Sequence, residues 1–444
     1  MTESTEDREI REQLKEQGLR EQLKEQVLRE LRMTEQLEDS EVEAVIDRVL
    51  LESSRKEYIP LARKLELRRA LFHSIRGLDV LSDFLEDPEI TEIMVNGTDP
   101  IYIERGGRVY RTEKAFESEE RLMNVIGQMI SGVNRTVNET NPIADAVLPD
   151  GSRVNVVLGT VSKGGHAVTI RKFPDQAFRM EDLIRIGSLT EEAAELLRLL
   201  VRAKYNIFVS GGTGAGKTTF LNALAEAIPE DERVITIEDV AELSLRGPKN
   251  LVRLEARNAN VEGKNRIDIR ELVRTSLRMR PDRIVVGEVR DAAAADMLTA
   301  MLTGHEGSLS TGHANSVSDM LLRLETMVLS AEDLPLTAIR RKIASALDII
   351  VHLGRLRDKS RRALEITEVV GYEGDEIVLR PLFLFEDTGD AGGKVQGRLV
   401  RMNRLLHVDK LCLAGCMEDY ERYSAVGEDT EHQYRVGERR QTGG

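Results

Sequence analysis

One segment of the chain restricts its fold more than any other. It reads Gly211-Gly212-Thr213-Gly214-Ala215-Gly216-Lys217-Thr218-Thr219, and the glycines, the lysine and the threonine have the spacing of a phosphate-binding loop. An apolar run at 205–210 precedes it and predicts a buried strand, and a helix-forming run at 219–227 follows. Such a loop surrounds phosphate with backbone N–H groups at a helix N-terminus, so we expect a bound nucleoside triphosphate such as ATP. Lys217 is expected to reach its β- and γ-phosphates, and Thr218 to hold Mg²⁺.

The composition narrows the class of protein. The 444 residues are 41% hydrophobic and 32% charged, without tryptophan, which favours two to three helix-rich domains in the cytosol. The net charge of -14 argues against general nucleic-acid binding, which needs a basic surface. We expect no transmembrane segment and no signal peptide, because there is no long apolar run and the first residues are acidic. The only two cysteines, Cys412 and Cys416, are expected to be free thiols.

The N-terminus predicts a charged helical extension. The segment 11–19 is repeated almost unchanged as 20–28, and both are rich in the helix formers Glu, Gln, Leu, Lys and Arg. The apolar residues recur at nine-residue offsets rather than at the heptad spacing of a coiled coil. We therefore expect a solvated, partly frayed helix. A helix that docks on a partner or on another copy is the alternative.

A small α+β domain is predicted next. Its strand signals are an alternating run at 91–97, a hairpin at 101–110, a second hairpin within 147–158 and a strand at 167–173. Pro174 indicates a linker at 172–175, because proline removes a donor and restricts the backbone.

From Met180 to about Leu353, strands and helices alternate. Strands are predicted at 206–210, 234–237, 283–286 and 308–311, and helices at about 190–203, 217–228, 268–279, 291–303 and 315–329. This alternation indicates a mainly parallel sheet with helices on both faces.

Acidic residues follow two of these strands. Glu238, Asp239 and Glu242 come after the strand 234–237, at the end of the sheet where ligands of parallel sheets bind. One carboxylate is a candidate to polarise the attacking water and others to hold the water shell of the metal; a capping or solvated role is the alternative. After 283–286, the usual acidic position is Gly287, so Glu288 is predicted to face Mg²⁺.

Two histidines and two arginines complete the candidates. His305 and His313 flank the predicted strand 308–311, and both are candidates to face the nucleotide. No cysteine cluster accompanies them, so zinc is not expected. Arg153 and Arg171, in the preceding domain, are candidate arginine fingers. A purely structural role is the alternative for each of the four.

Together these motifs resemble the hexameric secretion and pilus-assembly ATPases, most closely the CpaF-like branch of tight-adherence (Tad/Flp) pilus systems in the type II/IV secretion ATPase family. The resemblance covers about residues 65–415 and rests on 93–97, 148–155, 169–173, 211–219, 277–290 and 304–316. It implies an α/β fold in which a PAS-like α+β domain is linked to a RecA-like P-loop ATPase domain. It also implies a homohexameric ring with nucleotide between the two domains.

The resemblance assigns roles to the candidate residues. The catalytic residues would be Glu242, Glu288, His305 and His313; the nucleotide-binding residues would be 211–219, Arg153 and Arg171; the Mg²⁺ ligands would be Thr218 and Glu288. The expected segments are a charged helical extension (1–84), the PAS-like domain with its linker (85–174), the RecA-like domain (175–375), a C-terminal family region (376–416) and a polar, disordered tail (417–444).

The expected function is that of an ATP-hydrolysing motor. It would sit on the cytoplasmic face of the membrane, dock on an inner-membrane platform protein, and drive pilin or protein export. A RecA-like nucleic-acid translocase is the first alternative, which the acidic charge disfavours. The second is a nucleotide-gated scaffold with little turnover.

Overall fold

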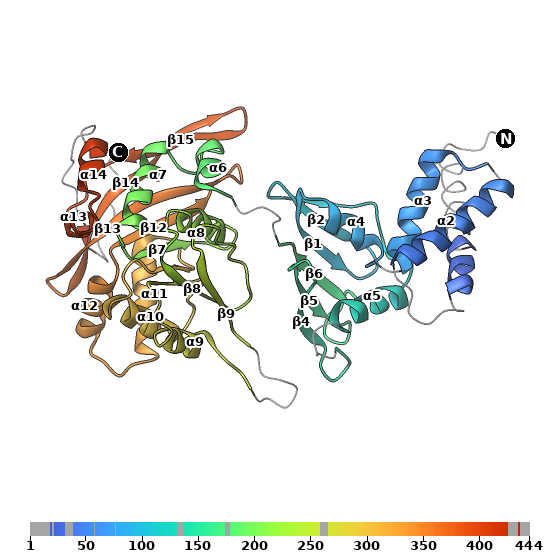
Figure 1. Ribbon diagram of the computed structural model, residues 1–444, viewed down its shortest axis with the longest axis horizontal. Helices are drawn as coiled ribbons and strands as arrows, with labels where there is room; N and C mark the ends of the chain where they lie inside the picture. The colour runs from blue at the N-terminus through green and yellow to red at the C-terminus, as the bar shows by residue number, and fades with distance from the viewer. Residues whose placement is uncertain are drawn as a thin grey trace. The chain divides into compact units, whose positions relative to one another are not determined.

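The chain folds into two compact units, Met1–Asp175 and Gln176–Gly444, which Figure 1 shows in ribbon form. The computed structural model describes residues 18–19, 22–31, 39–56, 58–75, 77–131, 137–173, 178–257, 265–424 and 434–435. The first copy of the repeat up to residue 17, the second half of the expected linker and most of the expected tail lie outside these residues.

The first unit begins with a small helical cluster. Helical residues 22–31 precede α2 (Asp39–Lys56) and α3 (Leu61–Ile75). Leu23 and Val27 lie four residues apart, so they share one helix face, and both are buried. They pack with Val42, Ile46, Val49, Leu50, Leu67 and Leu71. The expectation of a solvated helix is therefore wrong for this part of the second repeat.

The rest of the first unit is an antiparallel sheet with two helices. The strands are β1 (Ile90–Asn96), β2 (Ile101–Arg105), β3 (Arg108–Arg111), β4 (Ile143–Val147), β5 (Arg153–Val157) and β6 (Ala167–Arg171), in the order β3-β2-β1-β6-β5-β4. Alternate strand residues form one core with α4 (Val80–Glu86) and α5 (Glu119–Ser131). The hairpin predicted at 101–110 is confirmed as β2–β3; the one predicted within 147–158 is β4–β5, whose first strand begins earlier, at Ile143.

The second unit is built on a mixed sheet. Its strands are β7 (Ile207–Gly211), β8 (Arg233–Glu238), β9 (Asn250–Glu255), β10 (Arg283–Val286), β11 (Leu309–Gly312), β12 (Ile349–Arg355), β13 (Arg361–Glu373), β14 (Glu376–Ala391), β15 (Lys394–Arg401) and β16 (Tyr434–Arg435). The order is β15-β14-β13-β12-β7-β11-β10-β8-β9, with β16 paired to β14.

The parallel sheet predicted for 180–353 is confirmed, and antiparallel strands from beyond that range extend it. The strands from β12 to β9 in that order are parallel, whereas β13, β14 and β15 continue from β12 as antiparallel neighbours. Residues 376–401 form β14 and β15, so the sheet continues past residue 375 without interruption.

Helices cover both faces of this sheet. They are α6 (Met180–Arg185), α7 (Glu191–Arg202), α8 (Lys217–Ala225), α9 (Ile269–Ser276), α10 (Ala293–Leu302), α11 (Val317–Leu329), α12 (Leu336–Ala346), α13 (Asp409–Leu413) and α14 (Met417–Ser424). The five predicted helices are confirmed as α7 to α11. Side-chain caps fix several of their starts; for example, the Thr190 hydroxyl accepts from the backbone N–H of Ala193. Helix α14 lies where disorder was expected, so that expectation is wrong for 417–424.

Strand β7 is shared by two hydrophobic cores. Ile207 and Val209 belong to the core beneath α7 and α8, and Phe208 belongs to the core beneath α10 and α11. Hydrogen-bonded neighbours, β11 and β12, flank β7 on either side, and all of its residues are buried. The loop after β7 therefore starts from the middle of the sheet.

A buried ion pair lies near the start of the parallel strands. The side chain of Arg283 has no exposed surface; its guanidinium donates to both carboxylate oxygens of Glu232 and, at 2.6 Å, to the carbonyl oxygen of Val201. Replacing Arg283 by methionine removes the buried cation, and the Glu232 carboxylate, whose side chain is 12% exposed, keeps only the more distant ammonium of Lys204 at 3.7 Å. We expect the free energy of unfolding of the second unit to fall by about 3–5 kcal/mol.

Urea denaturation followed by circular dichroism measures this loss. The matched control is Arg185→Met, which removes an arginine from the exposed pair with Asp182 and is expected to have little effect. Equal effects of the two substitutions would contradict the expectation.

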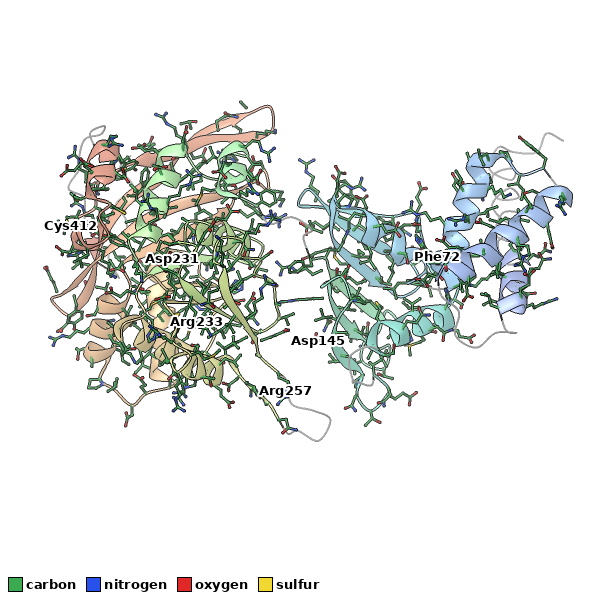
Figure 2. All side chains as sticks on the ribbon, in the orientation of Figure 1. Phe72, Asp145, Asp231, Arg233, Arg257 and Cys412 are labelled. Atoms are coloured by element: carbon green, nitrogen blue, oxygen red, sulfur yellow. The ribbon has the colours of Figure 1, made fainter. Side chains whose placement is uncertain are left out.

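The two cysteines are free thiols. Cys412 is exposed on α13, where Figure 2 labels it, and Cys416 is buried. This agrees with the sequence prediction. Within the described residues, no helix is both long and apolar enough to cross a membrane.

Candidate active site

The phosphate-binding loop connects β7 to α8. Gly214 and Gly216 have φ angles of 69° and 91°, a region that side chains disfavour, so glycine is required at both positions. Gly211 is required for a different reason: a Cβ there would lie 2.6 Å from the carbonyl oxygen of Leu353 on β12. Helix α8 starts at Lys217 and directs its N-terminal N–H groups toward the loop. The local structure is that of an anion site.

Lys217 is held inside the loop. Its ammonium donates to the carbonyl oxygens of Gly211 and Gly212, at 3.2 and 3.1 Å, and lies 3.1 Å from Nδ1 of His313. Only 8% of the residue is exposed. The cation is thus directed at the loop interior, where phosphate oxygens would replace these partners.

His313 connects this lysine to an acid. Because an ammonium only donates, Nδ1 of His313 accepts, and the ring proton is placed on Nε2, 2.8 Å from Oε1 of Glu288. Burial lowers the pKa of His313, and the positive charge of Lys217 lowers it further, so the imidazole is neutral at neutral pH.

Glu288 follows β10 and is ionised. Burial raises its pKa, but a hydrogen bond from Arg290 (2.7 Å) and the positive charge nearby outweigh that effect and lower the pKa overall. Arg290 also lies 3.6 Å from Asp239, so it joins the acids that follow β10 and β8. Its own pKa is raised, first by the hydrogen bond to Glu288.

Glu242 follows β8 and contacts Thr218, the residue after Lys217. Its Oε2 accepts a hydrogen bond of 3.1 Å from the Thr218 hydroxyl. Thr218, Glu242 and Glu288 thus gather at the carboxyl ends of β7, β8 and β10, as the sequence predicted for parallel strands. Thr218 and Glu288 are the side chains that fit Mg²⁺, a hard cation that takes one or two oxygen ligands besides phosphate and water. Among the described residues, no group of three or more His, Cys, Asp or Glu side chains is placed to hold a metal ion.

His305 does not join this site. In the parallel pairing of β11 with β7, Leu309 lies opposite Ile207 and Gly312 opposite Ser210. His313 therefore follows the end of β11 beside the phosphate-binding loop, whereas His305 precedes the other end. The structure therefore brings His313, but not His305, beside the phosphate-binding loop of the same chain.

Arg153 and Arg171 lie on the six-stranded sheet of the first unit. They are directly opposed across β5 and β6, and Glu92 on β1 is opposite Arg171 on its other side. The sequence treated these arginines as separate candidates, whereas the sheet places them side by side.

Two pockets adjoin the loop. One, of about 460 Å³, is in the size range of ligand sites and is lined by Gly212, Thr213, Glu288, Arg290, His313, Ala314, Asn315, Asp319 and Arg323. The other, of about 80 Å³, lies beside Ala215 and Gly216 and is mainly apolar, with Phe178, Leu183, Ile186 and Phe220 among its residues.

Sequence reasoning missed three arginines. Arg361, the first residue of β13, donates to the carbonyl oxygen of Gly214 at 2.8 Å. Nothing in the sequence linked this distant residue to the loop. Arg290 and Arg323 line the larger pocket; for Arg290 the signal was present, two residues after Glu288, but no role was assigned to it.

The fold and the site define a P-loop protein built for phosphoryl transfer: a phosphate-binding loop, a directed lysine and acidic side chains at the ends of neighbouring parallel strands. Residues 76–403 match the family model described as "Type II/IV secretion system protein". Conjugal transfer protein TrbB of Rhizobium radiobacter is 32% identical over 300 residues, covering 67% of this chain and 89% of TrbB. Type IV secretion system protein VirB11 of Brucella suis is 33% identical over 303 residues, covering 62% of this chain and 84% of VirB11.

A solved structure agrees on the fold. The crystal structure of the Yersinia pseudotuberculosis ATPase DotB is similar at a TM-score of 0.50 and 19% identity, over 68% of this chain and 80% of DotB. The chain belongs to the type II/IV secretion ATPase family, and it is an enzyme that hydrolyses ATP. The relatives are conjugal transfer and type IV secretion proteins, and they do not single out the tight-adherence branch suggested by the motifs.

Proposed function

We propose that this ATPase is the motor of a secretion or pilus-assembly machine, and that hydrolysis moves its two units relative to each other about the linker after Phe173. The observation that carries the proposal is the continuous chain of contacts from Lys217 through His313 and Glu288 to Arg290. This chain joins the phosphate-binding loop to the residues that follow β10 and β11, so a phosphate that replaced His313 at Lys217 would change the contacts of Glu288 and Arg290 as well.

The hydrolytic step needs three contributions. Lys217 and the loop N–H groups bind the β- and γ-phosphates and stabilise the charge that develops on them. Glu242 orients a water and accepts its proton as the water oxygen bonds to the γ-phosphorus; the bond to the bridging oxygen breaks, and ADP leaves. Thr218 and Glu288 would hold Mg²⁺, which supplies neutralising charge to the phosphates. The apolar pocket beside Gly216 suits the base of the nucleotide.

We further propose that six copies of a PAS-like first unit and a RecA-like second unit form a ring. In this arrangement Arg153 and Arg171 supply positive charge to a nucleotide. Their cross-strand placement supports the assignment, because two adjacent like charges favour a bound anion. The partner would be an inner-membrane platform protein on the cytoplasmic face, and the load a pilin or another exported protein. Membership of the tight-adherence branch rests on the sequence motifs.

Steady-state ATP turnover tests the proposal. Purified protein is assayed alone, with phosphatidylglycerol vesicles and with single-stranded DNA, and Lys217→Ala serves as the blank. We expect stimulation by vesicles and none by DNA. Stimulation by DNA alone would overturn the membrane motor in favour of a nucleic-acid translocase. Turnover no higher than the blank under all three conditions would also contradict the proposal.

A further inference from the structure

Glu238, the last residue of β8, is a buried acid at the end of the sheet that carries the phosphate-binding loop. Only 4% of the residue is accessible. Its Oε1 accepts two backbone hydrogen bonds, from Glu242 at 2.9 Å and from Leu243 at 2.8 Å. One side-chain oxygen thus holds the backbone of the loop that follows β8.

Gly287 provides the space for this carboxylate. It follows β10, the strand beside β8, and its N–H donates to the carbonyl oxygen of Ile237 at 2.9 Å. A Cβ at position 287 would lie 2.9 Å from Cγ and 3.3 Å from Oε1 of Glu238. Gly287 is not among the glycines with positive φ, so its missing side chain matters here, and its backbone freedom does not. This gives a physical reason for glycine where a phosphate-loop protein usually carries an acid.

The same loop is fixed a second time just beyond these bonds. The side-chain oxygen of Asn222 on α8 accepts from the backbone N–H of Ser244 at 3.0 Å, and Leu243 is buried in the core beneath α8. Between β8 and these anchors, the loop carries Glu242, whose carboxylate meets the Thr218 hydroxyl. The position of the Glu242 side chain therefore depends on backbone atoms that Glu238 holds.

We propose that Glu238 is a positioning residue for Glu242, and that Gly287 makes this possible by leaving room for the Glu238 side chain. Glu238 then acts through its hydrogen bonds to the loop and does not contact nucleotide, water or metal. The inference rests on the proposed role of Glu242 in hydrolysis.

The first test compares Glu238→Ala with Glu238→Gln. Alanine removes the acceptor of both N–H groups, and a displacement of about 1 Å at a catalytic group costs about 100-fold in rate. We expect kcat for ATP to fall by about that factor, while KM changes little because Lys217 and its loop are untouched. Glutamine keeps an oxygen in the place of Oε1, so its kcat is expected to remain within about threefold of the wild type. Amide hydrogen exchange at Glu242 and Leu243 should accelerate in the alanine variant only.

The matched control is Glu325→Ala. Glu325 is also a buried glutamate, 5% exposed, but it pairs with Arg340 away from the loop. It measures what the loss of any buried carboxylate does to kcat, and the unfolding midpoints of both variants are compared. A fall in kcat for Glu325→Ala as large as that for Glu238→Ala would overturn the inference.

A double-mutant cycle that combines Gly287→Ala with Glu238→Ala provides an independent test. Gly287→Ala should lower kcat, because the new Cβ displaces the Glu238 side chain. The three atoms nearest to that Cβ all belong to Glu238. In the Glu238→Ala background the same substitution should therefore have no further effect, and the two losses should not add. Additive losses would overturn the inference.

Two further outcomes separate this inference from the proposed function. If Glu238→Gln is as impaired as Glu238→Ala, the charge of Glu238 acts directly and the positioning role is wrong. If Glu238→Ala is unimpaired while Glu242→Gln is inactive, the positioning role again fails but the hydrolytic role of Glu242 stands. Full activity of Glu242→Gln would instead contradict the proposed function itself.

Discussion

Exchanging Glu242 for glutamine is expected to lower kcat for ATP hydrolysis by about 100- to 10,000-fold, the usual contribution of a positioned general base. Glutamine has nearly the same shape and can still accept the hydrogen bond from Thr218, but it cannot take a proton from water. ATP affinity should change little, because the loop and Lys217 keep their contacts. Phosphate release measures kcat, and isothermal titration with a non-hydrolysable ATP analogue measures affinity.

The control for this exchange is Glu230→Gln. Glu230 is an exposed glutamate, 65% accessible, which pairs only with the exposed Lys249 in the described part of the chain. We expect it to leave kcat unchanged. A Glu242→Gln enzyme that retains more than about a tenth of the wild-type kcat would remove Glu242 from the proposed mechanism.

The second large effect is expected for Lys217→Ala. Charged hydrogen bonds contribute about 1.5–3 kcal/mol each, so loss of the ammonium should weaken ATP binding by about 10- to 100-fold. Because the lysine also stabilises charge that develops in the transition state, kcat should fall by a further factor of about 100 to 1,000. Titration with ATP and single-turnover phosphate release separate the two losses.

Lys249→Ala is the matched control. It removes an exposed lysine, 79% accessible, whose ammonium pairs with Glu230 away from the loop. It should bind and hydrolyse ATP normally. If Lys217→Ala bound ATP as tightly as this control, the 3.1–3.2 Å contacts of the ammonium with the loop would be structural and not a phosphate site.

Much of the site could be predicted because parallel strands place their carboxyl ends together. The loop at 211–219, Glu242 and Glu288 each follow a strand that the apolar pattern identified, so their convergence followed from topology alone. The same rule also explains why His305 lies apart from the loop. It precedes β11, and a residue at the start of a parallel strand lies at the opposite edge of the sheet from one that follows it.

Other features could not be predicted, for identifiable reasons. The antiparallel strands β13 to β15 carry many exposed charged residues and belong to no βαβ unit, so the alternation that identified the parallel strands was absent. The contact of Arg361 with Gly214 spans 147 positions and depends on that extension of the sheet. The burial of the Glu238 side chain depends on the space beside Gly287. That space could be recognised only once the structure showed which residues lie next to Gly287.

The shared position of β7 affects how mutants of this enzyme are to be interpreted. Ile207 and Val209 belong to one core and Phe208 to the other, so a cavity made in either core can shift the strand that carries the catalytic loop. The rate of ATP hydrolysis therefore depends on side-chain packing in both cores of the second unit. Some core variants are expected to fold and yet lose ATP hydrolysis. An inactive variant is therefore not, by that fact alone, a variant of the active site. Genetic screens that score only activity will therefore identify residues of both hydrophobic cores together with residues of the active site.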